Sequence, residues 1–370
     1  MRILHLVTLL GTDGAFGGPA RVALNQAAEL RRRGHDVQVA AGWRGGRSRP
    51  HSINDVPMHL FPTIQLIPPL GFSGMVSPKL NWWLLKNVAK YDVLHIHAGR
   101  DLISMASLAV AWCKRRPYVI QSHGMIQPDP RLIARLLDLL ATRRFIKGAK
   151  KRFVLTQREQ DGLAKVLDFP IEFERLPNGV PHPPTTGMAV RKNEVLFCAR
   201  LQRRKRPVAF VEMAGEVLRR GIEASFAMVG PDDGELSNVL RTIQNLGLAS
   251  VVRYEGALNY EAVLNRMSQS GIFVLPSVDE PFPMSLLEAL SLGIPSVCTD
   301  TCDIAPVLRR TRSAIVASGS VEAMACAVIE ILTDDSLRRK LANNARQLVS
   351  EHFGMNVVGS RLEQSYAEVL

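Results

Sequence analysis

Two glutamates separated by seven residues, Glu280 and Glu288, lie in the segment best suited to chemistry. An apolar, β-branched run ends at Leu275 and a helical pattern begins after Pro283, so both carboxylates are expected to face one ligand at a strand end. The amides at the start of that helix lack partners within the helix and can donate to the same ligand. The surrounding positions are apolar, which argues against two ordinary surface acids.

Two cations, Arg200 and Lys205, follow another apolar run that ends at Cys198. A strand ending there, with a helix beginning soon after, would place both cations at the same kind of edge. Paired cations there suit an anionic ligand, although two basic residues on a solvated face would give the same pattern.

A glycine-rich loop from Gly11 to Pro19 follows the first predicted strand, and Pro19 opens the next helix. Backbone N–H groups near Gly17 and Gly18 could approach a phosphate at the positive end of that helix. The spacing is neither G-x-G-x-x-G nor that of a P-loop, which argues against a dinucleotide-dependent dehydrogenase.

The alternation of apolar, β-branched runs with amphipathic segments predicts two α/β domains with parallel sheets. The expected domains are 1–185 and 186–354, joined by the aperiodic stretch 180–187, with a helix at about 355–370 packing back on the first domain. Two Rossmann-like domains of this kind suit a ligand held in an interdomain cleft. The predicted strands are 3–7, 36–40, 93–97, 118–121, 152–155, 172–176, 194–198, 225–229, 251–254, 272–275, 296–299 and 313–316, and the first-half helices are 21–33, 80–90 and 102–114.

The net charge of +12 is distributed unevenly between the halves. Residues 1–185 contain 26 Lys and Arg against 13 Asp and Glu, whereas residues 186–370 contain 20 against 21. The first half is therefore the expected face toward an anionic lipid or acceptor. The five cysteines are scattered, which predicts a reduced, cytoplasmic protein, and no apolar stretch reaches the length of a membrane-spanning helix.

The chain resembles the retaining glycosyltransferases of family 4, which have the GT-B fold of two facing Rossmann-like domains. The paired glutamates are that family's signature motif. Further segments carry the resemblance along nearly the whole sequence: the glycine loop, 33–37, 122–124, 176–180, 200–205, 229–230 and 292–295.

The resemblance implies a role for each matching residue. Gly17 and Gly18 would approach the donor diphosphate from the first domain, and Arg200 and Lys205 would neutralise it from the second. Glu288 would bind the ribose hydroxyls, Glu280 the transferred sugar, and His123 the region beside the anomeric centre. The remaining donor-binding positions are Gly230, Phe282, Met284 and Ser285.

The chain departs from the family pattern at Pro281 and Pro283, which cannot donate hydrogen bonds to the sugar. The available amides are those of Phe282, Met284 and Ser285. The sequence contains no Asp-x-Asp motif, so neither a metal ion nor another cofactor is expected besides the nucleotide-sugar co-substrate. Cations and helix ends would stabilise the leaving diphosphate instead.

The expected reaction is the transfer of a hexose-type sugar to a lipid-linked or saccharide acceptor in bacterial polysaccharide, cell-envelope or glycolipid synthesis. Two first-half segments could serve a lipid-linked acceptor: 64–85, and the basic helical pattern 131–152, whose cations include Arg143 and Lys151. The protein is expected to be cytoplasmic and to associate peripherally with the inner face of an anionic membrane. An ordinary core helix with a solvated basic end explains the second segment equally well.

Two other function classes remain open. A nucleotide-sugar isomerase or hydrolase of the same fold would use the same donor site and turn over donor without acceptor. A polyanion-binding protein would explain the isoelectric point of about 9.8. The low aromatic content, the acid-balanced second half and the absence of a recognised binding module argue against nucleic acid as a partner.

Overall fold

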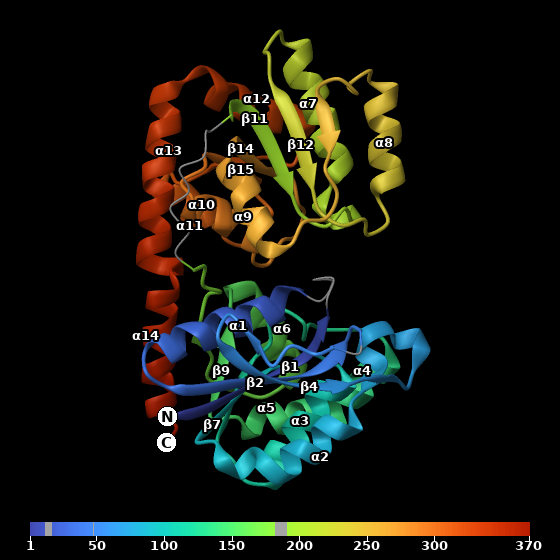
Figure 1. Cartoon of the computed structure of the whole chain (residues 1–370), viewed down its shortest axis with the longest axis vertical. Helices are drawn as coiled ribbons and strands as arrows, with labels where there is room; N and C mark the ends of the chain where they lie inside the picture. Colours follow the sequence, from blue (N-terminus) through green and yellow to red (C-terminus); the bar gives the residue numbers. More distant parts are fainter. Residues whose placement is uncertain (12–16, 47, 182–190) are drawn as a thin grey trace. The chain divides into compact units, whose positions relative to one another are not determined.

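The computed structural model describes residues 1–11, 17–46, 48–181 and 191–370, which form two α/β units (Figure 1). The first unit contains Met1–Gly179 together with Met355–Leu370, and the second contains Val180–Gly354. Most of the expected linker, 182–187, lies outside the described residues. Within the described part of the chain, every helix is too short or too polar to cross a bilayer.

The first unit is built on an eight-stranded sheet in the order β10-β9-β8-β7-β1-β2-β4-β3. Its strands pair in parallel except for the short edge strand β3, which is antiparallel to β4. The strands are β1 (Arg2–Gly11), β2 (Asp36–Arg44), β3 (Ser52–Ile53), β4 (Val56–Pro62), β7 (Val93–His97), β8 (Tyr118–Gln121), β9 (Lys151–Val154) and β10 (Glu174–Arg175). A separate hairpin pairs β5 (Ile64–Gln65) with β6 (Met75–Val76).

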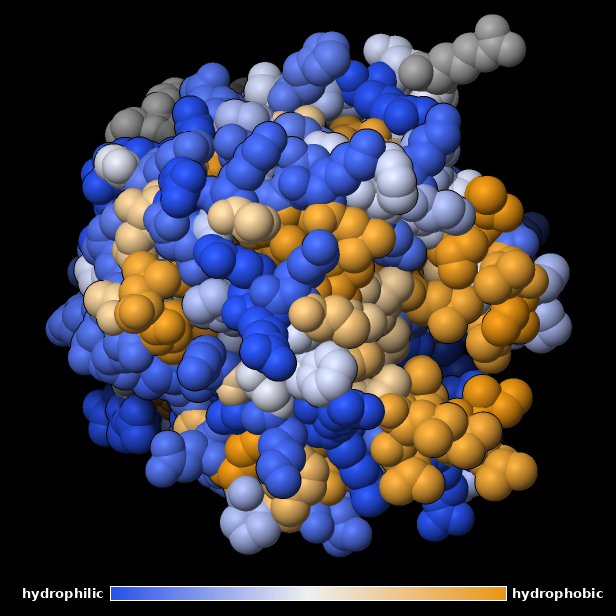
Figure 2. Space-filling model, turned by 90° about the horizontal axis from the view of Figure 1, so that it is seen from below, coloured by the Kyte–Doolittle hydropathy of each residue, from blue (hydrophilic) through white to orange (hydrophobic). Residues whose placement is uncertain are grey.

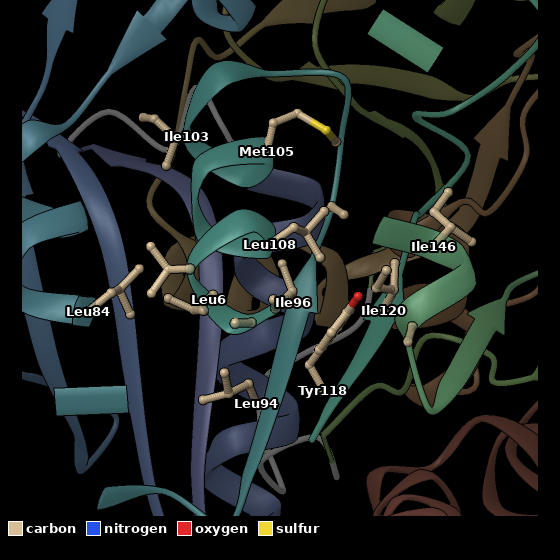
Figure 3. Close-up of a cluster of buried hydrophobic side chains, with 14 of the residues drawn as sticks. Leu6, Leu84, Leu94, Ile96, Ile103, Met105, Leu108, Tyr118, Ile120 and Ile146 are labelled. Atoms are coloured by element: carbon tan, nitrogen blue, oxygen red, sulfur yellow. The ribbon is translucent and has the colours of Figure 1, made fainter. Parts of the chain in front are cut away.

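The helices of the first unit cover both faces of this sheet. They are α1 (Gly17–Arg32), η1 (Pro68–Gly74), α2 (Pro78–Asn87), η2 (Val88–Lys90), α3 (Leu102–Cys113), α4 (Leu132–Leu137), η3 (Asp138–Thr142), α5 (Arg143–Gly148), α6 (Gln157–Leu167) and α14 (Met355–Ala367). Leu108 of α3 packs over Leu6 and Ile96 of the two central strands (Figure 3). This packing fixes the carboxyl ends of β1 and β7, where candidate site residues emerge.

Helix α14 follows the second unit in sequence but packs in the core of the first. Tyr366 is fully buried there, and its hydroxyl lies 2.6 Å from Nδ1 of His95. Glu363 forms an ion pair with Arg33 at 2.6 Å, and its Oε1 atom lies 2.8 Å from Nε2 of His35. The chain therefore returns to the first unit after completing the second.

The second unit has a six-stranded parallel sheet in the order β13-β12-β11-β14-β15-β16. Its strands are β11 (Arg191–Cys198), β12 (Ser225–Val229), β13 (Val252–Tyr254), β14 (Ser270–Leu275), β15 (Ser296–Thr299) and β16 (Ile315–Ala317). Its helices are η4 (Arg203–Lys205), α7 (Pro207–Arg219), α8 (Leu236–Asn245), α9 (Tyr260–Ser268), α10 (Met284–Ser291), α11 (Ala305–Thr311), α12 (Val321–Thr333), α13 (Asp335–Leu348) and η5 (Val349–Phe353).

The first unit differs from the sequence-based expectations in two places. Strand β4 is not predicted from the sequence, because Pro57 and Pro62 near its ends lack the N–H groups typical of a strand. The pattern from 131 to 152 is not one helix. It contains α4, the π-helical turn η3 and α5, and strand β9 already begins at Lys151.

Candidate active site

The charged residues predicted in the second unit gather at the carboxyl edge of its sheet, beside β11 and β14. These strands are neighbours, while the strands that follow each of them lie on opposite sides. In open parallel sheets such a reversal creates the crevice in which ligands usually bind. Arg200 and Lys205 come directly after β11, and Glu280 comes after β14.

Lys205 and Glu280 form a buried ion pair at this edge. The Nζ atom of Lys205 donates to Oε2 of Glu280 at 2.5 Å, and the side chains are only 12% and 6% exposed. Burial lowers the pKa of Lys205, and the neighbouring carboxylate opposes that shift. An ammonium group has three donors, so Lys205 can hold Glu280 and still bind a second anionic ligand.

Two arginines, Arg200 and Arg204, lie near the Lys205–Glu280 pair. Arg200 is half exposed and lies 3.4 Å from Asp233, measured between Nη1 and Oδ2. Arg204 lies on η4 beside Lys205 and donates to the carbonyl oxygen of Asp279 at 3.5 Å. Both guanidinium groups add to the lowering of the Lys205 pKa that burial begins, because nearby positive charges disfavour its protonated form.

Gly230 shapes the loop that carries Arg200. Its φ is 147°, and a Cβ at this position would lie 2.0 Å from the carbonyl oxygen of Ala199, so only glycine fits. Its N–H donates to the carbonyl oxygen of Gly256 at 2.9 Å. In this arrangement Gly230 allows a close approach of two loops, and its amide is already used within the protein.

Helix α10 places the remaining donor-site residues. It begins at Met284 after the N-cap residue Pro283, which makes no side-chain capping bond, so the amides of Met284 and Ser285 lie in the uncapped first turn. Phe282 is buried just before the helix, and Glu288 is buried in its second turn. The geometry thus brings a buried carboxylate and helix-start amides to the loop that follows Glu280.

In the first unit, the glycine loop is only partly described. Helix α1 begins at Gly17, and residues 12–16 lie outside the described residues, as does the loop approach expected from the sequence. A Cβ added to Gly18 would have no neighbouring atom within 4 Å. Gly18 is therefore not required here by steric crowding from the protein itself.

His123 follows β8 and is the outer member of a chain of histidines. Its φ of 51° is in the left-handed region, which a residue with a side chain seldom adopts. Its Nε2 lies 2.7 Å from Nδ1 of His97, and Nε2 of His97 lies 3.0 Å from Nδ1 of His5. His95, opposite His5 in the strand register, contacts Tyr366 instead.

These histidines are uncharged at neutral pH. Burial lowers the pKa of His5 and of His123 to about 3, and lowers the pKa values of His95 and His97 well below the usual range. The nitrogen atoms of His5, His95 and His97 lie within 4.8 Å of one another, as a metal site would require. However, the rings of His95 and His97 are stacked with an interplanar angle of 7°, so their in-plane lone pairs do not converge on one point.

Sequence reasoning missed three residues of these sites: His97, Arg204 and Asn178. The alternation His95-Ile96-His97 in a predicted strand could have indicated two histidines on one sheet face. Asn178 is buried, and its side chain opposes the lowering of the His123 pKa by burial. Its Oδ1 and the Nδ1 of His123 are buried without a hydrogen-bond partner among the described residues.

Comparison with protein families matches both halves of the chain. The family described as Glycosyltransferase Family 4 matches residues 16–182, and the family described as Glycosyl transferases group 1 matches residues 183–348. Together the two matches span most of the sequence and meet near the boundary between the units.

Individual relatives and solved structures agree. The N-acetyl-alpha-D-glucosaminyl L-malate synthase of Bacillus anthracis is 25% identical over 96% of this chain and 95% of its own length. The UDP-Gal:alpha-D-GlcNAc-diphosphoundecaprenol alpha-1,3-galactosyltransferase of Escherichia coli is 22% identical over 76% of each chain. The structure of Anabaena HepE in complex with UDP-glucose superposes with a TM-score of 0.76 at 16% identity, covering 100% of both chains. The chain has the GT-B fold and is a glycosyltransferase that belongs to family 4.

Proposed function

We propose that this glycosyltransferase moves a hexose-type sugar from a nucleotide-diphosphate donor to a lipid-linked or saccharide acceptor, with retention of the anomeric configuration. The observation that carries the donor part is the buried Lys205–Glu280 pair at the reversal point of the second sheet. It brings a cation suited to a diphosphate within 2.5 Å of a carboxylate suited to sugar hydroxyls. The relatives named above transfer sugars, which supports the same reaction class here.

Charge determines the roles that we assign. Cleavage of the bond between the anomeric carbon and the diphosphate leaves negative charge on the leaving group, which Arg200 and Lys205 neutralise together with the first-turn amides of α10. Glu288 binds the ribose hydroxyls, and Glu280 binds hydroxyls of the sugar. His123 contributes a hydrogen bond to the transferred sugar. A phosphate oxygen of the leaving group takes the acceptor proton, so no side chain is needed as a general base.

Retention without a metal ion is the first prediction. Screening UDP-, GDP-, ADP- and dTDP-sugars by thermal shift identifies the donor, since a ligand at 100 times its Kd stabilises the folded protein by about 2.7 kcal/mol. With that donor and a lipid-linked saccharide extract as acceptor, proton NMR is expected to show the donor's own anomeric configuration in the product. EDTA should leave the rate unchanged, because the gathered cations replace a metal. An inverted product, or donor turnover that does not depend on acceptor, contradicts the proposal.

The lipid-linked acceptor is supported by an exposed apolar surface on the first unit. Helix α4 and η3 expose large hydrophobic side chains that a folded protein normally buries, and hydrophobic groups protrude from the face shown in Figure 2. The residues, with their exposed fractions, are Leu132 (80%), Ile133 (68%), Leu136 (52%), Leu139 (63%) and Leu140 (66%). We name these five residues the α4 surface.

The α4 surface is fixed to the loop after β7. Arg100, three residues beyond His97, donates two hydrogen bonds of 2.8 Å to the carboxylate of Asp138, which begins η3. Both side chains are largely buried, so the contact holds the segment rigidly. An acceptor lipid held on this surface would therefore lie on an element that is linked to the edge carrying His123.

The basic residues near the α4 surface differ in their availability. Arg143 donates to the carbonyl oxygen of Val166, and Lys151 is paired with Glu174 and Glu368, so these two cations are engaged within the protein. Arg131 is exposed but paired with Asp129, and the other exposed cations of the segment are Arg135, Arg144, Lys147 and Lys150. Such a surface, apolar with flanking cations, suits the interface of an anionic bilayer.

Loss of membrane binding on polar substitution is the second prediction. The triple variant Ile133→Ser/Leu136→Ser/Leu140→Ser is expected to reduce co-sedimentation with anionic liposomes by about 100-fold in partition coefficient, taking roughly 1 kcal/mol for each partly inserted side chain. The matched control Leu240→Ser/Leu246→Ser removes exposed leucines from α8 and its end in the second unit and should bind as wild type does. Equal sedimentation of wild type and triple variant makes a water-dissolved saccharide the better acceptor.

A further inference from the structure

We propose that Glu159 is a positioning residue for His123: its buried carboxylate holds the turn that carries His123 in an unfavourable backbone conformation. The proposal rests on the function proposed above, because His123 is the residue that we assign to the transferred sugar. Glu159 acts through the backbone of this turn and not through contact with the sugar. The state of the turn can be observed without any substrate, so the two proposals can fail separately.

His123 lies in a tight turn directly after β8. The N–H of Met125 donates to the carbonyl oxygen of Ser122 at 2.9 Å, and the two residues between them, His123 and Gly124, have φ values of 51° and 73°. Two consecutive positive φ values closed by this hydrogen bond are typical of a type I′ turn. Glycine adopts such values readily, whereas a histidine does so at a cost in free energy. The turn therefore persists only with support from its surroundings.

Glu159 provides that support on both sides of His123. Its Oε1 atom accepts a hydrogen bond of 2.6 Å from the hydroxyl of Ser122 and one of 2.5 Å from the N–H of Gly124. The Glu159 side chain is buried, and hydrogen bonds to a buried carboxylate are short and strong. A single oxygen atom thus fixes the residues immediately before and after His123.

The other carboxylate oxygen anchors Glu159 to the sheet. Its Oε2 atom accepts from the N–H of Leu155 at 2.6 Å, directly after β9, the strand that pairs with β8. Glu159 is also the third residue of α6, and its own N–H donates to the hydroxyl of the N-cap residue Thr156 at 3.2 Å. A glutamate at this position commonly caps its own helix. Here Oε1 also holds a turn that lies 35 residues earlier in the chain at Gly124, which capping of α6 does not require.

The backbone of the turn determines where the ring of His123 lies. Its Nε2 is 2.7 Å from Nδ1 of His97, and the two rings are stacked with an interplanar angle of 10°. Relaxation of φ at His123 to the usual negative values would turn the Cα–Cβ bond and carry the ring away from this place. A misplacement of about 1 Å can slow an enzyme 100-fold, so a loosened turn should lower kcat. Donor binding, which we assign to the second unit, should change little.

The test compares Glu159→Ala with Glu159→Gln in the full chain. Glutamine can keep its amide oxygen at the Oε1 position, where Ser122 and Gly124 donate, and lose only the contact with Leu155, whereas alanine loses all of these contacts. We expect kcat to fall about 100-fold in Glu159→Ala with the KM for donor within about twofold of wild type, and to stay within about threefold in Glu159→Gln. Hydrogen–deuterium exchange of peptides that contain Gly124 should be fast in Glu159→Ala and slow in wild type and Glu159→Gln.

Thr156→Ala is the matched control, because it weakens the cap of the same helix without removing a contact beside His123. It should lower the melting temperature while kcat and the exchange of the turn remain as in wild type. A folded Glu159→Ala with the kcat of wild type overturns the inference, and so does a Glu159→Gln variant that is as slow as Glu159→Ala.

Ser122→Ala decides the question if Glu159→Ala does not fold. It removes one hydrogen bond beside His123 and leaves the carboxylate with the N–H groups of Gly124 and Leu155. A kcat about tenfold below wild type supports the inference, and an unchanged kcat overturns it. Failure of the proposed function would instead appear as a wild-type protein that transfers no sugar, while the exchange of the turn would still depend on Glu159.

Discussion

Replacing Lys205 by methionine is expected to lower kcat/KM for the sugar donor by about 100- to 1000-fold. The substitution keeps the length of the side chain but removes the cation that we assign to the leaving diphosphate. It also leaves Glu280, whose side chain is only 6% exposed, as a buried carboxylate without its ammonium partner. Breaking a buried pair from one side costs about 3–5 kcal/mol of folding free energy, so urea unfolding should show a clear loss of stability.

A second substitution separates these two effects. The double variant Lys205→Met/Glu280→Gln removes the orphaned charge, so it should recover much of the stability and none of the activity. Arg203→Met changes an exposed cation on the same turn η4 and serves as the control, with both properties near wild type. Calorimetric titration with the donor's nucleotide should show weaker binding for Lys205→Met and for Glu288→Ala. Unchanged nucleotide affinity in both would remove the donor site from this edge.

Acidification from pH 7 to pH 5 is expected to remove as much as about 8 kcal/mol from the stability of the first unit. Burial holds the pKa values of four histidines far below the value of about 6.5 that an unfolded chain has; they are His5, His95, His97 and His123. The native state holds them neutral while the unfolded state binds protons. Their contribution is therefore fully present above pH 6.5 and is lost as the pH falls below it, at roughly 2 kcal/mol for each ring by pH 5.

The measurement is the free energy of unfolding in urea at closely spaced pH values. Its slope near pH 5.5 should correspond to an uptake of about four protons on unfolding, and to about three in His97→Asn. Replacing the exposed His352 by glutamine should leave the slope unchanged. A stability that stays constant between pH 7 and pH 5.5 would mean that these imidazoles are not kept neutral by burial.

The sequence predicts the two-sheet architecture well because period and composition are local signals. The runs 3–7, 93–97 and 272–275 all lie within observed strands, since buried parallel strands are continuous apolar runs. Strand β4 is not predicted because Pro57 and Pro62, which lack an N–H group, usually argue against a strand, whereas the structure pairs them with Ser52 and Trp43. The segment 131–152 shows the same limit, since its charge pattern does not indicate that Lys151 starts a strand and pairs with Glu174.

In the candidate site, too, the sequence predicts the individual residues but not the contacts between them. Glu280, Glu288, Arg200 and Lys205 can be found from residue type and spacing, because each follows a strand or opens a helix. The direct contact between Lys205 and Glu280 cannot be predicted in this way. It depends on β11 and β14 being neighbours in the sheet, although two further strands separate them in sequence. The contacts of His97 with His5 and His123 likewise depend on the pairing of β7 with β1 and with β8.

The return of α14 to the first unit has a consequence for synthesis on the ribosome. Tyr366 fills the core beneath His95, but it is made only after the whole second unit has been translated. The second unit is continuous in sequence and can complete its core during translation. The core of the first unit stays incomplete until α14 has been synthesised. Domains usually fold in the order in which they are synthesised, but here the second unit is expected to complete its fold first. The first unit would remain incompletely folded for longer and would be the unit that binds chaperones.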